Sequence, residues 1–106
     1  MTTRLKELLV GQLEQIPGVV HQPWPGRDDG FSALLFRRKE LGHFHNFHEL
    51  DLRLGKALIK AEGLRHPADS KQHPGRSPNS PFIELRFHNE RDVAEIVRLV
   101  RLAVAR

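Results

Sequence analysis

The sequence predicts a single α+β domain, in which a mainly antiparallel sheet of about four strands carries helices on one face, in the order α-β-β-β-α-β-α. Three observations indicate this class. The chain has 106 residues, a length typical of one domain. Apolar residues recur at helical spacing near both ends and cluster or alternate as in strands between them. No glycine-rich turn joins a strand to a helix, which excludes Rossmann and P-loop architectures.

The N-terminal segment is predicted to be a helix. Thr2 or Thr3 can cap it, and Pro17-Gly18 ends it. Its buried stripe consists of Leu5, Leu8, Leu9, Leu13 and Ile16.

A short strand begins at the β-branched pair Val19 and Val20. Residues 21–30, HQPWPGRDDG, are dense in Pro, Gly and Asp and predict a flexible loop. Trp24 lies there between two prolines that restrict its backbone, and we expect it to fold back over the core, with ligand stacking as the alternative.

Residues 31–39, FSALLFRRK, predict a strand, and 43–47, HFHNF, predict its hairpin partner after a turn at Glu40-Leu41-Gly42. The alternating LDLRL at 50–54 is interpreted as an extended lead into a helix over about 54–62. Gly63 suits the left-handed cap of that helix, and a helix start at Asp51 is the alternative.

Residues 65–80 contain three prolines and no periodic pattern, so they predict a second flexible loop, either a cover for a site or a mobile segment. The strand that follows has Ile83, Leu85 and Phe87 inward, with Glu84 and Arg86 outward. Asn89 then caps the last helix, whose first turn Asp92 supports, and the inward stripe of that helix is Val93, Ile96, Val97, Val100 and Val104.

Composition excludes several classes of site. Cysteine is absent, so disulfides, thiolate metal ligands and a thiol nucleophile are excluded. Charged residues interrupt every apolar run before it reaches the length of a signal peptide core or membrane span, which favours a soluble, cytoplasmic protein. The formal charge of +4 is scattered, with Arg37-Arg38-Lys39 as the only consecutive basic run, so we expect a solvated basic surface with weak attraction to nucleic acid.

The segment 39–50, KELGHFHNFHEL, is the strongest candidate for a functional site. Side chains two apart on a strand share a face, so His43 and His45 should project together, with Cα atoms about 7 Å apart. Phe44 should point into the core between them. Two imidazoles at this spacing can share a metal ion or hold one anion.

The favoured interpretation is a non-enzymatic module that binds a small anionic or polar ligand and has no tightly bound cofactor or metal. His43 and His45 would donate hydrogen bonds, Arg37 or Arg38 would add charge, and Glu40 would orient one imidazole. The 65–80 loop would act as a movable cover. Such a site predicts that ligand affinity rises as the histidines protonate below about pH 6.5.

Three alternatives stay open. His43 and His45 can line the solvent side of a strand without a ligand. They can belong to a metal-dependent enzyme, although no spacing selects among the other candidate ligands, which are Glu40, His48, Asp51, His66 and His73. The chain can also be a DNA-associated protein that binds without sequence specificity, although it has no recognised nucleic-acid motif. No serine lies in a nucleophile-elbow context, and His66 and His73 are expected to be solvated.

Several segments resemble those of the luciferase domain family, a small domain of unknown function. They are ELGHFH at 40–45, LDL at 50–52, LIKAEGLRHP at 58–67 and the strand and helix from Phe82 onward. The chain departs from the family pattern in having Pro81-Phe82 where Gly-Trp is common and Val104 where a Tyr is frequent. The order of elements is also similar to that of MmcQ/YjbR-like proteins. The positions that match the family pattern are Glu40, Gly42, His43, His45, Asp51, Gly63 and His66. Together with the adjacent cations, this gives the candidate ligand-binding set Glu40, His43, His45, Arg37 and His66.

Overall fold

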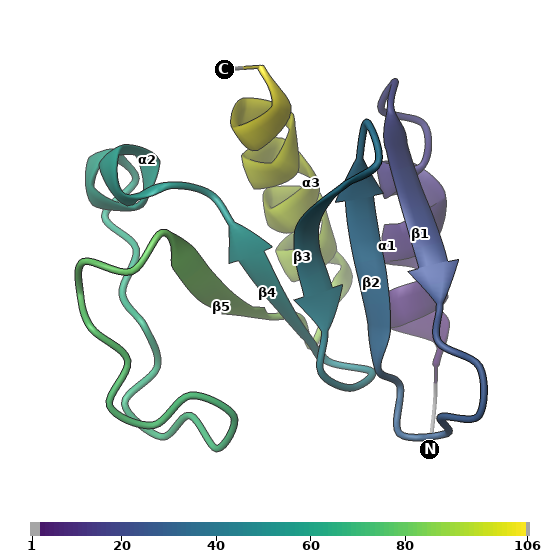
Figure 1. Ribbon diagram of the computed structural model, residues 1–106, viewed down its shortest axis with the longest axis horizontal. Coiled ribbons are helices and arrows are strands. Elements are labelled where there is room, and N and C mark those ends of the chain that lie inside the picture. The colour runs from purple at the N-terminus through teal and green to yellow at the C-terminus, as the bar shows by residue number, and fades with distance from the viewer. Residues whose placement is uncertain (1–2, 106) are drawn as a thin grey trace.

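The computed structural model describes residues 3–105, which form five strands and three helices (Figure 1). In chain order these are α1 (Arg4–Leu13), β1 (Val19–Pro23), β2 (Ser32–Phe36), β3 (Lys39–Phe44), β4 (Glu49–Arg53), α2 (Lys56–Ala61), β5 (Phe82–Arg86) and α3 (Glu90–Val104). The strands form one antiparallel sheet in the order β1-β2-β3-β4-β5. The α+β class and the antiparallel sheet are therefore confirmed.

Helices α1 and α3 lie side by side against one face of this sheet (Figure 1). The core lies between the two layers, because the inward positions of the central strands are apolar, as at Phe44, Leu50 and Leu52, which are fully buried. Leu9 of α1 and Val93 of α3 meet them from the helical side. The opposite face of the sheet carries no long helix and is left for polar side chains.

The sheet has one strand more than predicted. Residues 50–54 were expected to lead into a helix, but most of this segment belongs to β4, which pairs with both β3 and β5. The alternation of leucines there reflects a strand with one apolar face, and α2 begins only at Lys56, so a helix start at Asp51 is wrong. The predicted cap is confirmed: Gly63 has a φ of 67°, and the amides of Gly63 and Leu64 donate to Lys60 and Ile59 in a Schellman motif.

The β2–β3 turn lies earlier than predicted. It is formed by Arg37 and Arg38, with φ values of 50° and 72°, rather than by Glu40-Leu41-Gly42. Two left-handed residues are typical of the type I′ hairpin turn, whose twist matches that of the strands. Glu40 is thus a strand residue, and Leu41 is an extra residue in β3, because Leu34 pairs with Gly42 while Leu35 pairs with Glu40.

The N-terminal elements also differ in detail. Helix α1 ends at Leu13, before the proline, and Thr3 bonds the Glu7 side chain instead of capping the backbone, while Thr2 lies outside the described residues. Strand β1 runs through Pro23, which is tolerated because β1 is an edge strand. Trp24 does not cover the core: it is 48% exposed, and its ring meets that of Phe31 in a T-shaped arrangement.

The C-terminal elements agree with the prediction. The Asn89 side chain accepts a hydrogen bond from the Asp92 amide at 2.9 Å and so caps α3. Between α2 and β5 the chain has no helix or strand over residues 62–81, as expected for the second loop. None of the helices described within residues 3–105 is long and apolar enough to cross a membrane.

Candidate metal centre

Three acidic or basic side chains form a row across the helix-free face of the sheet. His43 of β3 pairs in register with Asp51 of β4, which pairs in turn with Glu84 of β5. Paired residues of adjacent strands point to the same face, so the three side chains are neighbours. Although this face has no helix, Asp51 and Glu84 are only 1% and 3% exposed. Something must therefore cover them.

His45 extends the row at the end of β3. Its ring lies at 4.7 Å from that of His43 in an edge-to-face arrangement, and Phe44 between them is fully buried on the other side. The expectation that the two imidazoles share a face is confirmed. It follows from the two-residue period of the strand.

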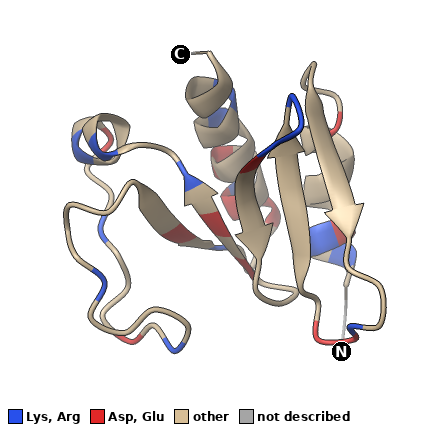
Figure 2. Cartoon of the chain, in the orientation of Figure 1, with Lys and Arg blue, Asp and Glu red and all other residues tan. Residues whose placement is uncertain are grey.

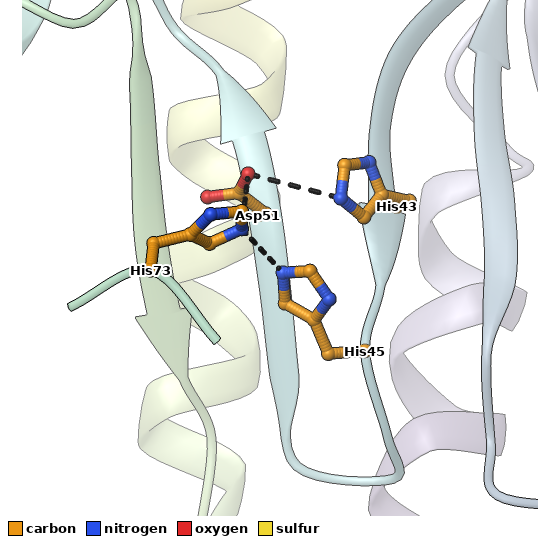
Figure 3. Close-up of side chains that lie close together, drawn as sticks. All are labelled: His43, His45, Asp51 and His73. Carbon is orange, nitrogen blue, oxygen red and sulfur yellow. Dashed lines mark hydrogen bonds and ion pairs between the residues drawn. The ribbon is translucent and has the colours of Figure 1, made fainter. Parts of the chain in front are cut away.

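The cover is the loop between α2 and β5, which places His73 over the row (Figure 3). The Nε2 atom of His73 lies 3.0 Å from Nε2 of His45 and 3.5 Å from Oδ2 of Asp51. The same Oδ2 atom is 3.8 Å from Nε2 of His43. His73 is therefore half-buried at the site, and the expectation that it is solvated is wrong, because the loop folds back onto the sheet. One donor atom from each of His43, His45, Asp51 and His73 lies within 4.8 Å of the others.

Arg76 of the same loop neutralises the buried carboxylate. Its Nη1 and Nη2 atoms donate to Oδ1 and Oδ2 of Asp51 at 2.5 Å and 2.8 Å, the parallel arrangement in which a guanidinium binds a carboxylate most strongly. The loop thus brings both an imidazole and a cation to Asp51. Sequence reasoning missed Arg76, since a residue in an aperiodic loop has no pattern that assigns it to a face.

Further hydrogen bonds hold the loop in place. Ser70 donates to Oε1 of Glu84 at 2.6 Å, and its oxygen accepts from the His73 amide at 3.0 Å. His66 binds the carbonyl oxygen of His73 through Nε2 at 2.8 Å, which makes Nε2 the protonated nitrogen. Glu84 therefore serves as the anchor on the sheet for the covering loop. Its place next to Asp51 follows from the strand register, which the sequence alone does not specify.

The remaining predicted residues lie at different distances from this cluster. Oε2 of Glu40 is 3.7 Å from Nδ1 of His43, a contact made on the same face because the extra residue at Leu41 shifts the alternation of β3. Arg37 lies in the turn at the other end of β3, with its guanidinium over the Phe36 ring at 5.2 Å. His48, another candidate metal ligand, stacks on His88 and is not part of the cluster.

The histidines of the loop and strand are disposed to be neutral. Burial lowers the pKa of His45, and the adjacent His43 lowers it further. Burial also lowers the pKa of His73, as does the charge of Arg76. For Glu84, burial opposes ionisation, but the hydrogen bond from Ser70 and the charge of Arg86 outweigh it and lower the pKa. The shifts thus favour the neutral form of His45 and His73 and the ionised form of Glu84.

This donor set fits a divalent transition metal. Three neutral imidazoles and a carboxylate are ligands typical of zinc, with metal–ligand distances of about 2.0–2.1 Å. Tetrahedral ligands at that distance lie about 3.3 Å from one another. Three separations in the cluster, 3.0, 3.5 and 3.8 Å, lie around this value, and all the donor atoms lie within 4.8 Å of one another. Glu40 approaches the second nitrogen of His43 at 3.7 Å, from the side on which an outer carboxylate commonly orients a metal-bound imidazole.

Comparison with known proteins finds one match. The family model described as "Luciferase domain" matches residues 38–103, which is more than half of the chain. The matched segment includes all four residues of the cluster, His43, His45, Asp51 and His73. No curated protein and no solved structure matches the chain significantly.

Proposed function

The chain belongs to the luciferase domain family, and we propose that this member is a metal-binding domain that holds a divalent ion of the zinc type through His43, His45, Asp51 and His73. The observation that carries the proposal is the convergence of four donor atoms, from β3, β4, the turn between them and the loop before β5. A cluster that served only the fold would not need three imidazoles aimed at one point beside a buried carboxylate.

A metal cation suits the charges of the site better than the small anion expected from the sequence. An anion placed between His43 and His45 would lie beside the buried carboxylates of Asp51 and Glu84, whose ion pairs with Arg76 and Arg86 leave little net positive charge to attract it. The charge of Arg76 does not attract an anion either, because Arg76 already binds both oxygens of Asp51. The lowered pKa values of His45 and His73 also favour the neutral form that binds a metal.

Each residue of the cluster would have a distinct role in holding the metal ion. His43 projects from β3 and His45 follows its last residue, so these two form the more rigid part of the centre, and His73 completes it when the loop lies against the sheet. Oδ2 of Asp51 faces both His43 and His73, and Arg76 holds the carboxylate in position through its shorter bond to Oδ1. A metal ion bound there supplies Lewis acidity and lowers the pKa of bound water.

Calorimetric titration of the tag-free protein with zinc tests the proposal. We expect one ion per chain, and replacement of His45 or His73 by Gln should weaken binding by more than the about 10–100-fold typical of outer-shell partners. His88→Gln is the matched control, because His88 is an exposed histidine outside the cluster. Absence of zinc binding, or equal binding by His45→Gln and His88→Gln, would refute the assignment.

The pH dependence separates the metal from an anionic ligand. Protons compete with a metal for the imidazoles, so zinc affinity should fall as the pH drops below about 6.5. An anion held by protonated histidines would show the opposite trend. Titrations with zinc and with inorganic phosphate at pH 7.5 and 5.5 measure both slopes, and phosphate binding that strengthens at pH 5.5 and disappears in His43→Gln/His45→Gln would favour the anion site.

A further inference from the structure

Strands β3 and β4 separate at one end of the sheet. The two strands pair over three residues of each strand, from Gly42 opposite Leu52 to Phe44 opposite Leu50. Beyond these pairs the strands diverge (Figure 1). A cavity of about 570 Å³ lies at this end. We call it the splay cavity. Its volume lies within the range of about 300–1,000 Å³ that is typical of small-molecule sites.

Both apolar and charged side chains line the splay cavity. Phe36, Leu41, Phe82 and Ala103 supply the walls. Lys39 and Arg53 also line it, and both are exposed and form no ion pair with any residue from 3 to 105. Figure 2 shows this basic charge at the β2–β3 turn and at the tip of β4, on either side of the divergence. Glu40 is the one acidic residue that lines the cavity.

The cavity adjoins the metal centre through two shared residues. Glu40 lines the cavity and approaches Nδ1 of His43 at 3.7 Å. Phe82 lines it as well, and its ring lies 6.5 Å from that of His43. Arg53 is the cross-strand neighbour of Phe82 and lies over its ring at 5.9 Å, so the cation is held beside the apolar wall.

We propose that the splay cavity binds an amphipathic anion, with an apolar chain against the phenylalanines and a carboxylate or phosphate head group between Lys39 and Arg53. A ligand in this position lies next to His43. We infer that this ligand is also the substrate of the metal centre, and this part of the inference rests on the proposed function. Binding of the ligand to the splay cavity does not depend on the proposed function.

Titrations followed by NMR, with and without zinc, test the proposal. The probes are octanoate and octyl phosphate, with acetate and octylammonium as controls for the chain and the charge. We expect octanoate or octyl phosphate to shift the Ala103 methyl and Phe82 signals. Each should bind at least about tenfold more tightly than octylammonium, since a charge-assisted hydrogen bond contributes about a factor of ten. Each should also bind at least about tenfold more tightly than acetate, since the octyl chain buries apolar surface. The comparison of the two anions identifies the head group. Equal binding of octylammonium would overturn the proposal.

Variants locate the site. Lys39→Gln/Arg53→Gln should weaken octanoate and octyl phosphate about tenfold or more, because both cations are lost. Arg38→Gln/Lys60→Gln removes the same charge from exposed positions that do not line the cavity and should leave affinity within about twofold. Ala103→Leu should also weaken binding by filling the cavity. Equal effects of the two charge variants would reduce the interaction to general attraction and refute the site.

Zinc affinity measured in the same variants keeps the two proposals apart. It should be unchanged in Lys39→Gln/Arg53→Gln, because neither residue belongs to the metal cluster. If the protein fails to bind zinc but binds octanoate in a way that depends on Lys39 and Arg53, the metal centre is wrong and the splay cavity stands. If it binds zinc but neither anion, the splay cavity is wrong and the metal centre stands.

Discussion

Asp51 and Arg76 form an ion pair whose two side chains differ in conformational freedom. Asp51 is fixed on a central strand and almost fully buried, whereas Arg76 belongs to a loop and can turn toward water. We therefore predict that Arg76→Gln lowers the free energy of unfolding by about 3–5 kcal/mol, since it leaves a buried carboxylate without its cation. Asp51→Asn should cost less, about 1–2 kcal/mol, because the freed guanidinium becomes solvated and repulsion with Glu84 is removed.

Urea denaturation of both variants in EDTA tests this order. Zinc should restore more stability to Arg76→Gln than it adds to the wild type, because the ion supplies the missing positive charge. A larger cost for Asp51→Asn than for Arg76→Gln would contradict the asymmetry.

The lowered pKa values of His45 and His73 predict a pH dependence of stability in the metal-free protein. In the unfolded chain both histidines titrate near 6.5, and in the folded chain they titrate lower. Between these values the unfolded state binds more protons, so the free energy of unfolding decreases as the pH falls through this window. The full contribution is present above about pH 6.5.

Urea denaturation at pH 7.5 and 5.5 in EDTA measures this effect. His45→Gln/His73→Gln should have a smaller loss of stability over the same interval, whereas His88→Gln should keep the loss of the wild type. An unchanged slope in the double variant would show that other groups dominate.

At the residue scale, site residues that lie on or next to a regular strand could be predicted from the sequence, whereas those in the irregular loop could not. His43 and His45 were paired correctly because a strand alternates, and Phe44 was placed in the core for the same reason. His73 was misjudged because the loop has no period, and its position depends on hydrogen bonds made across the fold. The contact of Glu40 with His43 was expected, yet the geometry that permits it, an extra residue in the strand, has no marker in the sequence.

At the scale of elements, Gly42 determines how closely β3 approaches β4. A Cβ atom at this position would overlap the carbonyl oxygen of Asp51 and press on Leu52, both of which are backbone contacts in the adjacent strand. We predict that Gly42→Ala pushes β3 and β4 apart and lowers the free energy of unfolding by about 1–3 kcal/mol. It should also weaken zinc binding, because His43 lies on β3 and Asp51 on β4, so the distance between these two proposed ligands increases.

Gly11→Ala is the control for this substitution. Gly11 lies within α1, and a Cβ atom there meets no atom within 4 Å. Alanine should stabilise the helix by about 0.5–1 kcal/mol and leave zinc affinity unchanged. Urea denaturation and calorimetry of the two variants provide the comparison, and full zinc affinity in Gly42→Ala would show that close strand approach is not required.

The elements differed in how clearly the sequence marked them. Helix α3 was placed well because its apolar stripe is long and Asn89 is a strong cap. Strand β4 was mistaken for a lead into α2 because Leu50 and Leu52 fit either an extended segment or a strand, and only pairing partners distinguish the two. The β2–β3 turn was placed too late because Arg37 and Arg38 adopt left-handed conformations in which glycine or asparagine would have been the expected marker.

At the scale of the whole molecule, the proposed metal centre would connect the covering loop to the sheet. His43, His45 and Asp51 are held by the sheet, whereas His73 comes from the 62–81 segment, whose contacts with the face are mainly polar. Zinc should therefore stabilise the fold and fix the loop at the same time. At a free zinc concentration 100 times the Kd, mass action adds about 2.7 kcal/mol. For a domain of this size that corresponds to a rise in Tm of about 10–20 °C.

Thermal unfolding and amide exchange, each measured with zinc and with EDTA, distinguish the contribution of the loop from that of the sheet. Zinc should slow exchange of the His73 amide, which donates to Ser70, as well as raise Tm. In His73→Gln the amide should exchange equally fast in zinc and EDTA, because any ion bound by the other three ligands no longer holds the loop. A rise in Tm without added protection of the loop in the wild type would show that His73 is not a ligand. The metal would then bind through sheet residues alone, and the loop would cover the site only through Arg76 and Ser70.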